Sequence, residues 1–343
     1  MKLPSRPGYD ELTPAHVLDA LDALGLHPDG RLLQLNSYEN RVHQLFLEDG
    51  RAVVTKFYRP GRWSDEQILE EHAFALELAE AEVPVVAPMV LLGSAHPQLR
   101  LLGKPPTLAR WEADGQMHRF SVSPRCAGRE PELEHPDTLQ RLGSFIGRLH
   151  LVGQRRAFSH RLRMDPPADA AAAIETVRAL GMPGASEVHA WLDAARRAQA
   201  AIADAFARHG RLELLRVHGD CHLGNVLWRE DESGGGPHVV DLDDACMGPA
   251  VQDLWMLVSG DAGTMAAQFA RLLQGYEQWR DFAARETALI EPLRTLRMLR
   301  HSAWLGLRWS DPAFPAAFPF FDTPAYWSQQ TVQLREQIEL MNA

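Results

Sequence analysis

The chain has 343 residues, 45% of them hydrophobic, and is therefore long enough for two domains with proper cores. Its formal net charge of −10 argues against a general binder of nucleic acids or anionic membranes, because those surfaces attract cations. The three cysteines are an odd number without a short framework spacing, which predicts reduced thiols and a cytoplasmic location. No window resembles a signal peptide or the roughly 20 apolar residues of a membrane span, so we expect neither.

The first third of the chain predicts strands and one main helix. Asp49-Gly50 is a strong hairpin signal between two apolar runs, residues 41–48 and 52–58. Ser64 and Gln67 then form a capping-box pattern at the start of a helix. The buried face of that helix is predicted from the residues that share one arc of a helical wheel, namely Ile68, Leu69, His72, Ala73, Ala75, Leu76 and Ala79.

Beyond about residue 124 the pattern becomes mainly helical. Apolar residues recur at helical spacing after Pro136-Asp137, and alanine-rich stretches between 168 and 208 predict two more helices. Near residue 217 the pattern changes to loop, strand, a glycine-rich turn at 233–236, and a second strand. Helices return from Pro249 onward. A small β-rich region is thus followed by a larger helical one.

The most informative segment is His218-Gly219-Asp220-Cys221-His222-Leu223-Gly224-Asn225. Its spacing equals that of the protein-kinase catalytic loop, H-R-D-L-x-x-x-N, with Gly219 in place of arginine. Asp241 ends a following strand, and the intervening turn would return it to Asn225. Asp220 and Asp241 are therefore the candidate catalytic residues, Asp220 as proton acceptor, with Asn225 and Asp241 as candidate Mg²⁺ ligands beside ATP. The alternative is a loop whose polar side chains only satisfy backbone groups.

Lys56 lies among apolar strand residues, where an unpaired ammonium is costly to bury. In kinases such a lysine holds the α- and β-phosphates and pairs with a helix glutamate. Glu71 borders the apolar arc of the predicted helix, whereas Glu70 lies in its polar arc, so Glu71 is the predicted partner. The alternative is a Lys56 that snorkels from an edge strand while both glutamates are solvated.

Residues 35–41 stand where protein kinases have a glycine-rich phosphate loop, yet they contain no glycine. Ser37 is the candidate contact to ATP, and an ordinary turn residue is the alternative. Two acids after Asp241 also remain open. Asp243 and Asp244 either tune the metal site or face water.

Two further groups of side chains each allow two interpretations. A basic cluster either receives an acidic substrate or forms a solvated helix end, and consists of Arg148, Arg155, Arg156, Arg161 and Arg163. An aromatic group either forms a peptide groove or packs inside the domain, and consists of Trp304, Trp309, Phe314, Phe318, Phe320, Phe321, Tyr326 and Trp327.

On these residues the chain resembles the aminoglycoside phosphotransferase and choline kinase-like superfamily. The likeness rests on His218-Gly219-Asp220 through Asn225, on Val240-Asp241, on Gly248-Pro249 and on Asp253-Leu254. The chain also resembles the sequence motifs of a bacterial stress-response kinase subgroup at residues 35–42, 56–60, 241–245, 248–257 and 311–315. The resemblance therefore covers nearly the whole chain.

The resemblance implies an α+β, bilobal protein kinase-like fold. Its small β-rich lobe with one main helix would span residues 1–123, and its larger, mainly helical lobe residues 124–343. It further implies a cytoplasmic, ATP- and Mg²⁺-dependent serine/threonine protein kinase of the bacterial stress response. Asp220 would accept the proton, Asn225 and Asp241 would hold Mg²⁺, and Ser37 would contact ATP. We expect a monomer that acts on protein substrates and binds neither nucleic acid nor membrane.

Three rival functions stay open. The residues by themselves indicate a kinase that acts on a hydroxyl group but do not identify the acceptor, so a small alcohol or sugar is an alternative to a protein. A metal-dependent phosphoesterase would arrange two metals around His218, Asp220, His222, Asn225 and Asp241, but it leaves Lys56 without a role. The third is a nucleotide-binding module without turnover.

Overall fold

The computed structural model describes residues 12–93, 96–135, 137–181, 185–230 and 235–342. The chain divides into two compact units, residues 1–162, 216–246 and 256–281, and residues 163–215, 247–255 and 282–343. The lobe boundary between residues 123 and 124 remains a prediction. The start of the glycine-rich turn predicted at 233–236, like Pro136, lies outside the described residues. Within the described ranges, none of the helices has both the length and the apolar character needed to cross a bilayer.

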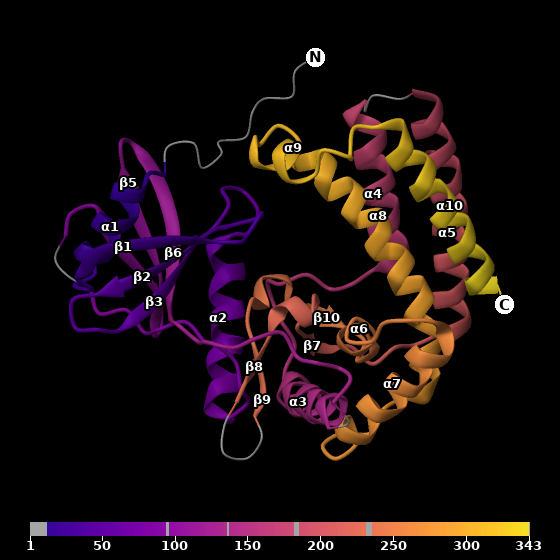
Figure 1. The fold of residues 1–343 in the computed structure, drawn as a ribbon, viewed down its shortest axis with the longest axis horizontal. Coiled ribbons are helices and arrows are strands. Elements are labelled where there is room, and N and C mark those ends of the chain that lie inside the picture. The colour runs from indigo at the N-terminus through magenta and orange to yellow at the C-terminus, as the bar shows by residue number, and fades with distance from the viewer. Residues whose placement is uncertain (1–11, 94–95, 136, 182–184, 231–234, 343) are drawn as a thin grey trace. The chain divides into compact units, whose positions relative to one another are not determined.

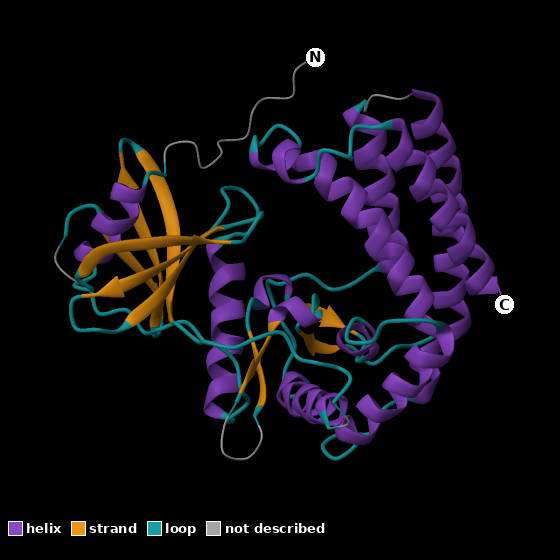
Figure 2. Cartoon of the chain, viewed as in Figure 1, coloured by secondary structure: helices purple, strands orange, loops and turns teal. Residues whose placement is uncertain are grey.

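The first unit contains a six-stranded antiparallel sheet in the order β1-β2-β3-β6-β5-β4 (Figures 1 and 2). The turn at Asp49-Gly50 joins β2 to β3, and Gly50 adopts a positive φ of 84°, so the predicted hairpin is confirmed. The strands are β1 (Pro28–Leu35), β2 (Arg41–Leu47), β3 (Ala52–Phe57), β4 (Leu99–Gly103), β5 (Pro106–Ala113) and β6 (Gln116–Pro124).

The two faces of this sheet pack against different helices, because side chains alternate along each strand. On one face, α1 (Pro14–Ala23) forms a core with Val53 and Phe57 of β3. On the other face, Tyr58 forms a smaller core with Ile68 of α2 (Asp65–Glu80). Alternation from Tyr58 places Lys56 on this second face, the face that packs against α2.

Helix α2 begins at the predicted capping box, in which Ser64 and Gln67 exchange side-chain-to-backbone hydrogen bonds. Its predicted buried face is partly wrong. Phe74 is fully buried because it contacts the Phe158 ring edge-on and lies under the Arg216 guanidinium. The buried face of α2 is therefore rotated about the helix axis relative to the predicted arc. The buried residues are Ile68, Glu71, His72, Phe74, Ala75 and Leu78, whereas Leu69, Ala73 and Leu76 line an open cavity.

The rest of the first unit carries a second hairpin and two closely packed helices. Strands β8 (Val226–Arg229) and β9 (Gly236–Val239) pair antiparallel, and the 3-10 helices η1 (Leu223–Asn225) and η2 (Leu242–Asp244) flank them. Helices α3 (Thr138–Gly153) and α7 (Ala262–Tyr276) approach so closely that a Cβ at Gly143 would collide with the Leu272 carbonyl. The short strands β7 (Leu215–Val217) and β10 (Cys246–Gly248) occur where the chain passes between units.

The second unit is mainly helical among its described residues. Its core includes Trp191 and Trp327, whose rings meet edge to face with centroids 5.4 Å apart. Phe314 and Phe321 are also fully buried, which favours the packing interpretation for the aromatic group. The elements are α4 (Pro166–Leu180), α5 (Ala185–His209), α6 (Val251–Trp255), η3 (Ala284–Leu289), α8 (Ile290–Arg308), α9 (Ala313–Ala317) and α10 (Pro324–Asn342).

Candidate active site

The loop that carries Asp220 is held by His218. Nδ1 of His218 accepts the backbone N–H of Asp220 at 3.3 Å, and Nε2 donates to the carbonyl oxygen of Val240 at 3.0 Å. Both ring nitrogens are thus engaged, which leaves His218 a structural role rather than that of a metal ligand. Gly219 has a φ of 85°, and a Cβ there would collide with the carbonyl oxygen of Asp244. Glycine, not arginine, fits this backbone.

The predicted return of Asp241 to Asn225 is present. Asn225 donates its Nδ2 to the carbonyl oxygen of Asp220 at 2.9 Å, which leaves its Oδ1 as an acceptor. The backbone N–H of Val240 donates to the carbonyl oxygen of Asn225 at 3.0 Å. Asp241 adopts a left-handed conformation, with φ 62° and ψ 64°, which aspartate tolerates better than most residues. The hairpin therefore brings these residues together, and their chemical roles remain predictions.

Lys56 reaches this hairpin from the sheet. Its Nζ lies 2.6 Å from Oδ1 of Asp241 and 3.9 Å from Oδ1 of Asp243. Burial opposes the charge of the ammonium, but the two carboxylates outweigh it and raise the pKa of Lys56 well above its usual value. The predicted ion pair with Glu71 does not form within 4 Å, because the carboxylates that follow the hairpin are nearer.

Asp243 is the buried centre of the surrounding network, with only 4% of its side chain exposed. Its Oδ2 accepts from Arg62 at 2.5 Å and from Nδ2 of Asn40 at 3.1 Å. Burial disfavours its charge, but Lys56 and Arg62 outweigh that effect and keep the pKa of Asp243 below its usual range. Arg62 also binds Asp244 at 2.7 Å, whose side chain is 41% exposed. Of the two acids left open by the sequence, Asp243 therefore faces the site.

Asn40 connects the 35–41 segment to this network. Its side-chain Oδ1 accepts the backbone N–H of Arg59 at 3.2 Å, and its own backbone N–H donates to Oγ of Ser37 at 3.3 Å. Ser37 therefore closes a turn, and its contact to ATP remains a prediction. Sequence reasoning missed Arg62 altogether. Arg62 lies just before the helix cap at Ser64, outside any helical or strand pattern, so no periodicity in the sequence points to it.

Glu71 is buried on α2, as its position at the border of the apolar arc predicted. Burial raises the pKa of Glu71 to about 7, although Lys56 works in the opposite direction. The neighbouring His72 is neutral, because burial lowers its pKa to about 3. His72 bonds the hydroxyl of Tyr58 at 2.7 Å and that of Thr107 at 2.9 Å, which anchors α2 to the sheet.

We expect the Glu71→Gln variant to change how stability depends on pH. The pKa of Glu71 is about 7 in the folded protein against 4.5 when exposed, so the folded state binds more protons between these values. The free energy of unfolding should therefore fall as pH rises through this window, by on the order of 3 kcal/mol at most. The variant should lack this fall and gain stability relative to wild type from pH 5 to pH 8 in urea unfolding.

The adjacent Glu70→Gln variant is the matched control. Burial opposes the charge of Glu70, but backbone N–H groups of Ser159, Arg161 and His160 bind its carboxylate and lower its pKa. Its contribution to stability is present above the unfolded pKa and is lost as pH falls. Relative to wild type, this variant should be less stable by a nearly constant amount from pH 5 to pH 8, because the pH dependence due to Glu70 lies below its unfolded pKa of 4.5. Equal trends in both variants would contradict the assignment of Glu71.

The oxygen groups around the hairpin suit a hard divalent cation. Mg²⁺ prefers carboxylate and amide oxygens, and the side chains of Asp220 and Asp241 are 27% and 45% exposed. Asn225 and Asp241 could hold such an ion. His222 accepts the backbone N–H of Gly224 with Nδ1, and its Nε2 lies 3.6 Å from Oδ2 of Asp220. The phosphoesterase hypothesis needs both histidines as ligands, and these contacts disfavour it.

The basic cluster predicted from the sequence is split by the fold. Arg161 is buried, donates to the carbonyl oxygens of Asp243 and Ala245, and lies 4.1 Å from the ring centroid of Trp63. It therefore supports the loop after Asp241. Arg148 donates to the carbonyl oxygen of Glu82, Arg163 belongs to the second unit, and Arg155 and Arg156 are exposed beside α2.

Comparison with known proteins places the chain among phosphotransferases. The model of the phosphotransferase enzyme family matches residues 31–289. Stress response kinase A from Escherichia coli strain K12 is 40% identical over 97% of this chain and 94% of that protein. The serine/threonine protein kinase RdoA from Salmonella typhimurium strain LT2 is 38% identical over 97% of this chain and 95% of that protein.

Solved structures extend the likeness to the fold. An amicoumacin kinase in complex with AMP-PNP and Ca²⁺ matches with a TM-score of 0.69 and 19% identity, over 96% of this chain and 93% of that chain. A microcompartment-associated aminopropanol kinase matches with a TM-score of 0.68 and 19% identity, over 95% and 98%. The predicted α+β, kinase-like fold class is confirmed.

Proposed function

Because the chain belongs to the phosphotransferase enzyme family, we propose that it is an ATP- and Mg²⁺-dependent kinase of protein serine and threonine hydroxyls. The observation that carries this proposal is the 2.6 Å ion pair between Lys56 and Asp241, because kinases use such a lysine to hold phosphates and such an aspartate to hold Mg²⁺. The protein substrate and a role in stress response draw on the names of the relatives. A cytoplasmic location, suggested by an odd number of cysteines without a framework spacing, and a monomeric state complete the proposal.

In the proposed reaction, Asp220 accepts the proton of the acceptor hydroxyl. The oxygen of that hydroxyl attacks the γ-phosphorus of ATP, and ADP leaves. Lys56 holds the α- and β-phosphates. When bound by Asn225 and Asp241, Mg²⁺ would neutralise charge on the β- and γ-phosphates. Asp243 would keep Lys56 and the 35–41 turn in place through the contacts described above.

The direct test incubates the purified protein with γ-labelled ATP and Mg²⁺ in parallel reactions. One contains the protein alone, one contains dephosphorylated casein, and others contain choline or kanamycin as small hydroxyl acceptors. We expect label on serine or threonine of casein, identified by mass spectrometry, and no transfer when EDTA removes the metal.

Two outcomes would contradict parts of this proposal. Transfer to choline or kanamycin without transfer to casein would reject the protein acceptor and leave a small-molecule kinase. Hydrolysis of a phosphoester such as p-nitrophenyl phosphate, with no transfer from ATP to any acceptor, would reject the kinase itself.

A further inference from the structure

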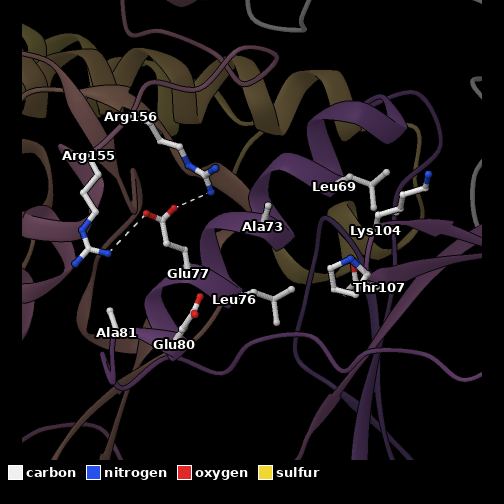
Figure 3. A pocket seen from close by; sticks show the side chains of 12 residues that line it. Leu69, Ala73, Leu76, Glu77, Glu80, Ala81, Lys104, Thr107, Arg155 and Arg156 are labelled. Atoms are coloured by element: carbon white, nitrogen blue, oxygen red, sulfur yellow. Dashed lines mark ion pairs between the residues drawn. The ribbon is translucent and has the colours of Figure 1, made fainter.

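A cavity of about 850 Å³ lies along α2 in the first unit (Figure 3). Its walls come from the outer surface of α2, from the turn between β4 and β5, and from the segment after α3. At 100° per residue, Glu71 lies roughly opposite the residues of α2 that line the cavity. The cavity is therefore separate from the candidate active site, on the other side of the same helix.

The floor of this cavity is an apolar stripe. Leu69, Ala73 and Leu76 follow the i, i+4, i+7 spacing of one helical face. Sequence periodicity predicts these residues to be buried, yet they line an open cavity. Figure 3 shows Arg155 and Arg156 at one end and Lys104 at the other, with the apolar residues between.

Arginines gather at one end of the cavity around a single carboxylate. Oε2 of Glu77 lies 2.7 Å from Arg156 and 2.8 Å from Arg216, and its Oε1 lies 4.0 Å from Arg155. Arg216 is buried and also donates to backbone carbonyls at the end of α3. The side chains of Arg155 and Arg156 are 54% and 59% exposed, so both remain accessible to a further anion.

The other end carries Lys104, which makes no ion pair with any residue in the described part of the chain. Glu80 also lines the cavity. Among the residues that line the cavity, three cations, Lys104, Arg155 and Arg156, face two carboxylates, an excess of one positive charge on a chain whose net charge is −10. This local excess favours an anionic partner that attaches at both ends.

We propose that this groove docks an acidic segment of the protein substrate, with carboxylates on both sides of a short apolar stretch. The bound carboxylate of Glu77 demonstrates that the arginine end accepts this group. From Leu69 to Leu76 the helix rises about 10 Å, which an extended peptide spans with about three residues. The identity of the partner as a substrate rests on the proposed function. The binding of an acidic peptide in the groove is independent of that function.

Binding can be measured without phosphotransfer. The probe is a short fluorescein-labelled peptide in which two glutamates stand on each side of Ala-Leu-Ala, titrated with the full chain and followed by fluorescence anisotropy. The Lys104→Ala/Arg155→Ala/Arg156→Ala variant should bind it at least tenfold more weakly. The control Arg178→Ala/Arg196→Ala/Arg197→Ala variant, which removes the same charge from exposed positions, should bind it like wild type. Glu80→Gln should tighten binding, because it removes a repelling carboxylate.

Several results would overturn the proposal. These are no binding to wild type, equal loss in both triple variants, or unchanged affinity in the groove variant. A lysine-for-glutamate peptide that binds equally well would also reject it. Tighter binding of a DNA oligonucleotide or of phosphatidylserine vesicles through the same three residues would assign the groove to another partner class.

Kinetics separate this proposal from the proposed function. With dephosphorylated casein, which is acidic, the groove variant should raise KM for casein several-fold and leave KM for ATP unchanged. An unchanged KM for casein in an active kinase would reject docking of the substrate. If no acceptor is phosphorylated but the peptide still binds through the three cations, the groove stands as a docking site and the kinase proposal fails.

Discussion

Replacing Asp220 with Asn should lower phosphoryl transfer by about 10²- to 10⁴-fold while nucleotide binding is retained. An amide cannot accept the proton of the attacking hydroxyl, but it preserves the shape of the side chain. The backbone contacts that shape this loop, through His218 and Asn225, do not depend on the carboxylate. The measurements are initial rates with labelled ATP and the affinity for a fluorescent ATP analogue.

An exposed carboxylate provides the control for this experiment. Asp193 is 71% exposed on α5, and Asp193→Asn removes the same charge away from the candidate site. Its rates and its melting temperature should match those of wild type. Transfer by Asp220→Asn within a few-fold of wild type would reject Asp220 as the proton acceptor, and joint loss of transfer and nucleotide binding would point to a damaged fold instead.

The second large effect is expected at Asp243. Asp243→Asn removes the charge that faces Lys56 and Arg62 in a buried position, and it leaves both cations with one carboxylate fewer. Breaking a buried charge network by removing one member typically costs about 3–5 kcal/mol of stability. Because Asp243 also contacts Asn40 and lies near Lys56, KM for ATP should rise as well. Urea unfolding and steady-state kinetics measure the two effects.

Asp244→Asn is the matched comparison, because Asp244 binds the same arginine with a partly exposed side chain. Its cost should be about 1 kcal/mol or less. A double-mutant cycle of Asp243→Asn with Arg62→Met should show a coupling that the cycle of Asp244→Asn with Arg62→Met lacks. Equal stability of the two aspartate variants would show that Asp243 is not the centre of the network.

Local sequence patterns predicted the structure correctly where it depends on residues close together in the chain. The Asp49-Gly50 hairpin and the Ser64 capping box follow from the turn and capping chemistry of a few consecutive residues. The same holds for the loop from His218 to Asn225 and for the strand that returns Asp241 to it. A pairing of neighbouring strands brings these residues together without help from distant sequence.

Helix periodicity, by contrast, predicted burial correctly at some positions of α2 and wrongly at others. A helical wheel identifies an apolar arc but contains no information on what covers it. Phe74 is buried because Phe158 and Arg216 pack on it, and both are far away in the sequence. Leu69 and Leu76, which the wheel predicts to be buried, face a cavity instead.

The kinase-like fold class and the set of oxygen-bearing side chains on one hairpin were thus predictable from residue patterns. The pairing of Lys56 with Asp241 rather than Glu71, and the contacts of Asp243 with Arg62 and Asn40, emerge only from the folded chain. These contacts join residues about 180 to 200 positions apart. Charge pairing in a buried site depends on distance and desolvation, which three-dimensional packing sets and which no short sequence pattern encodes.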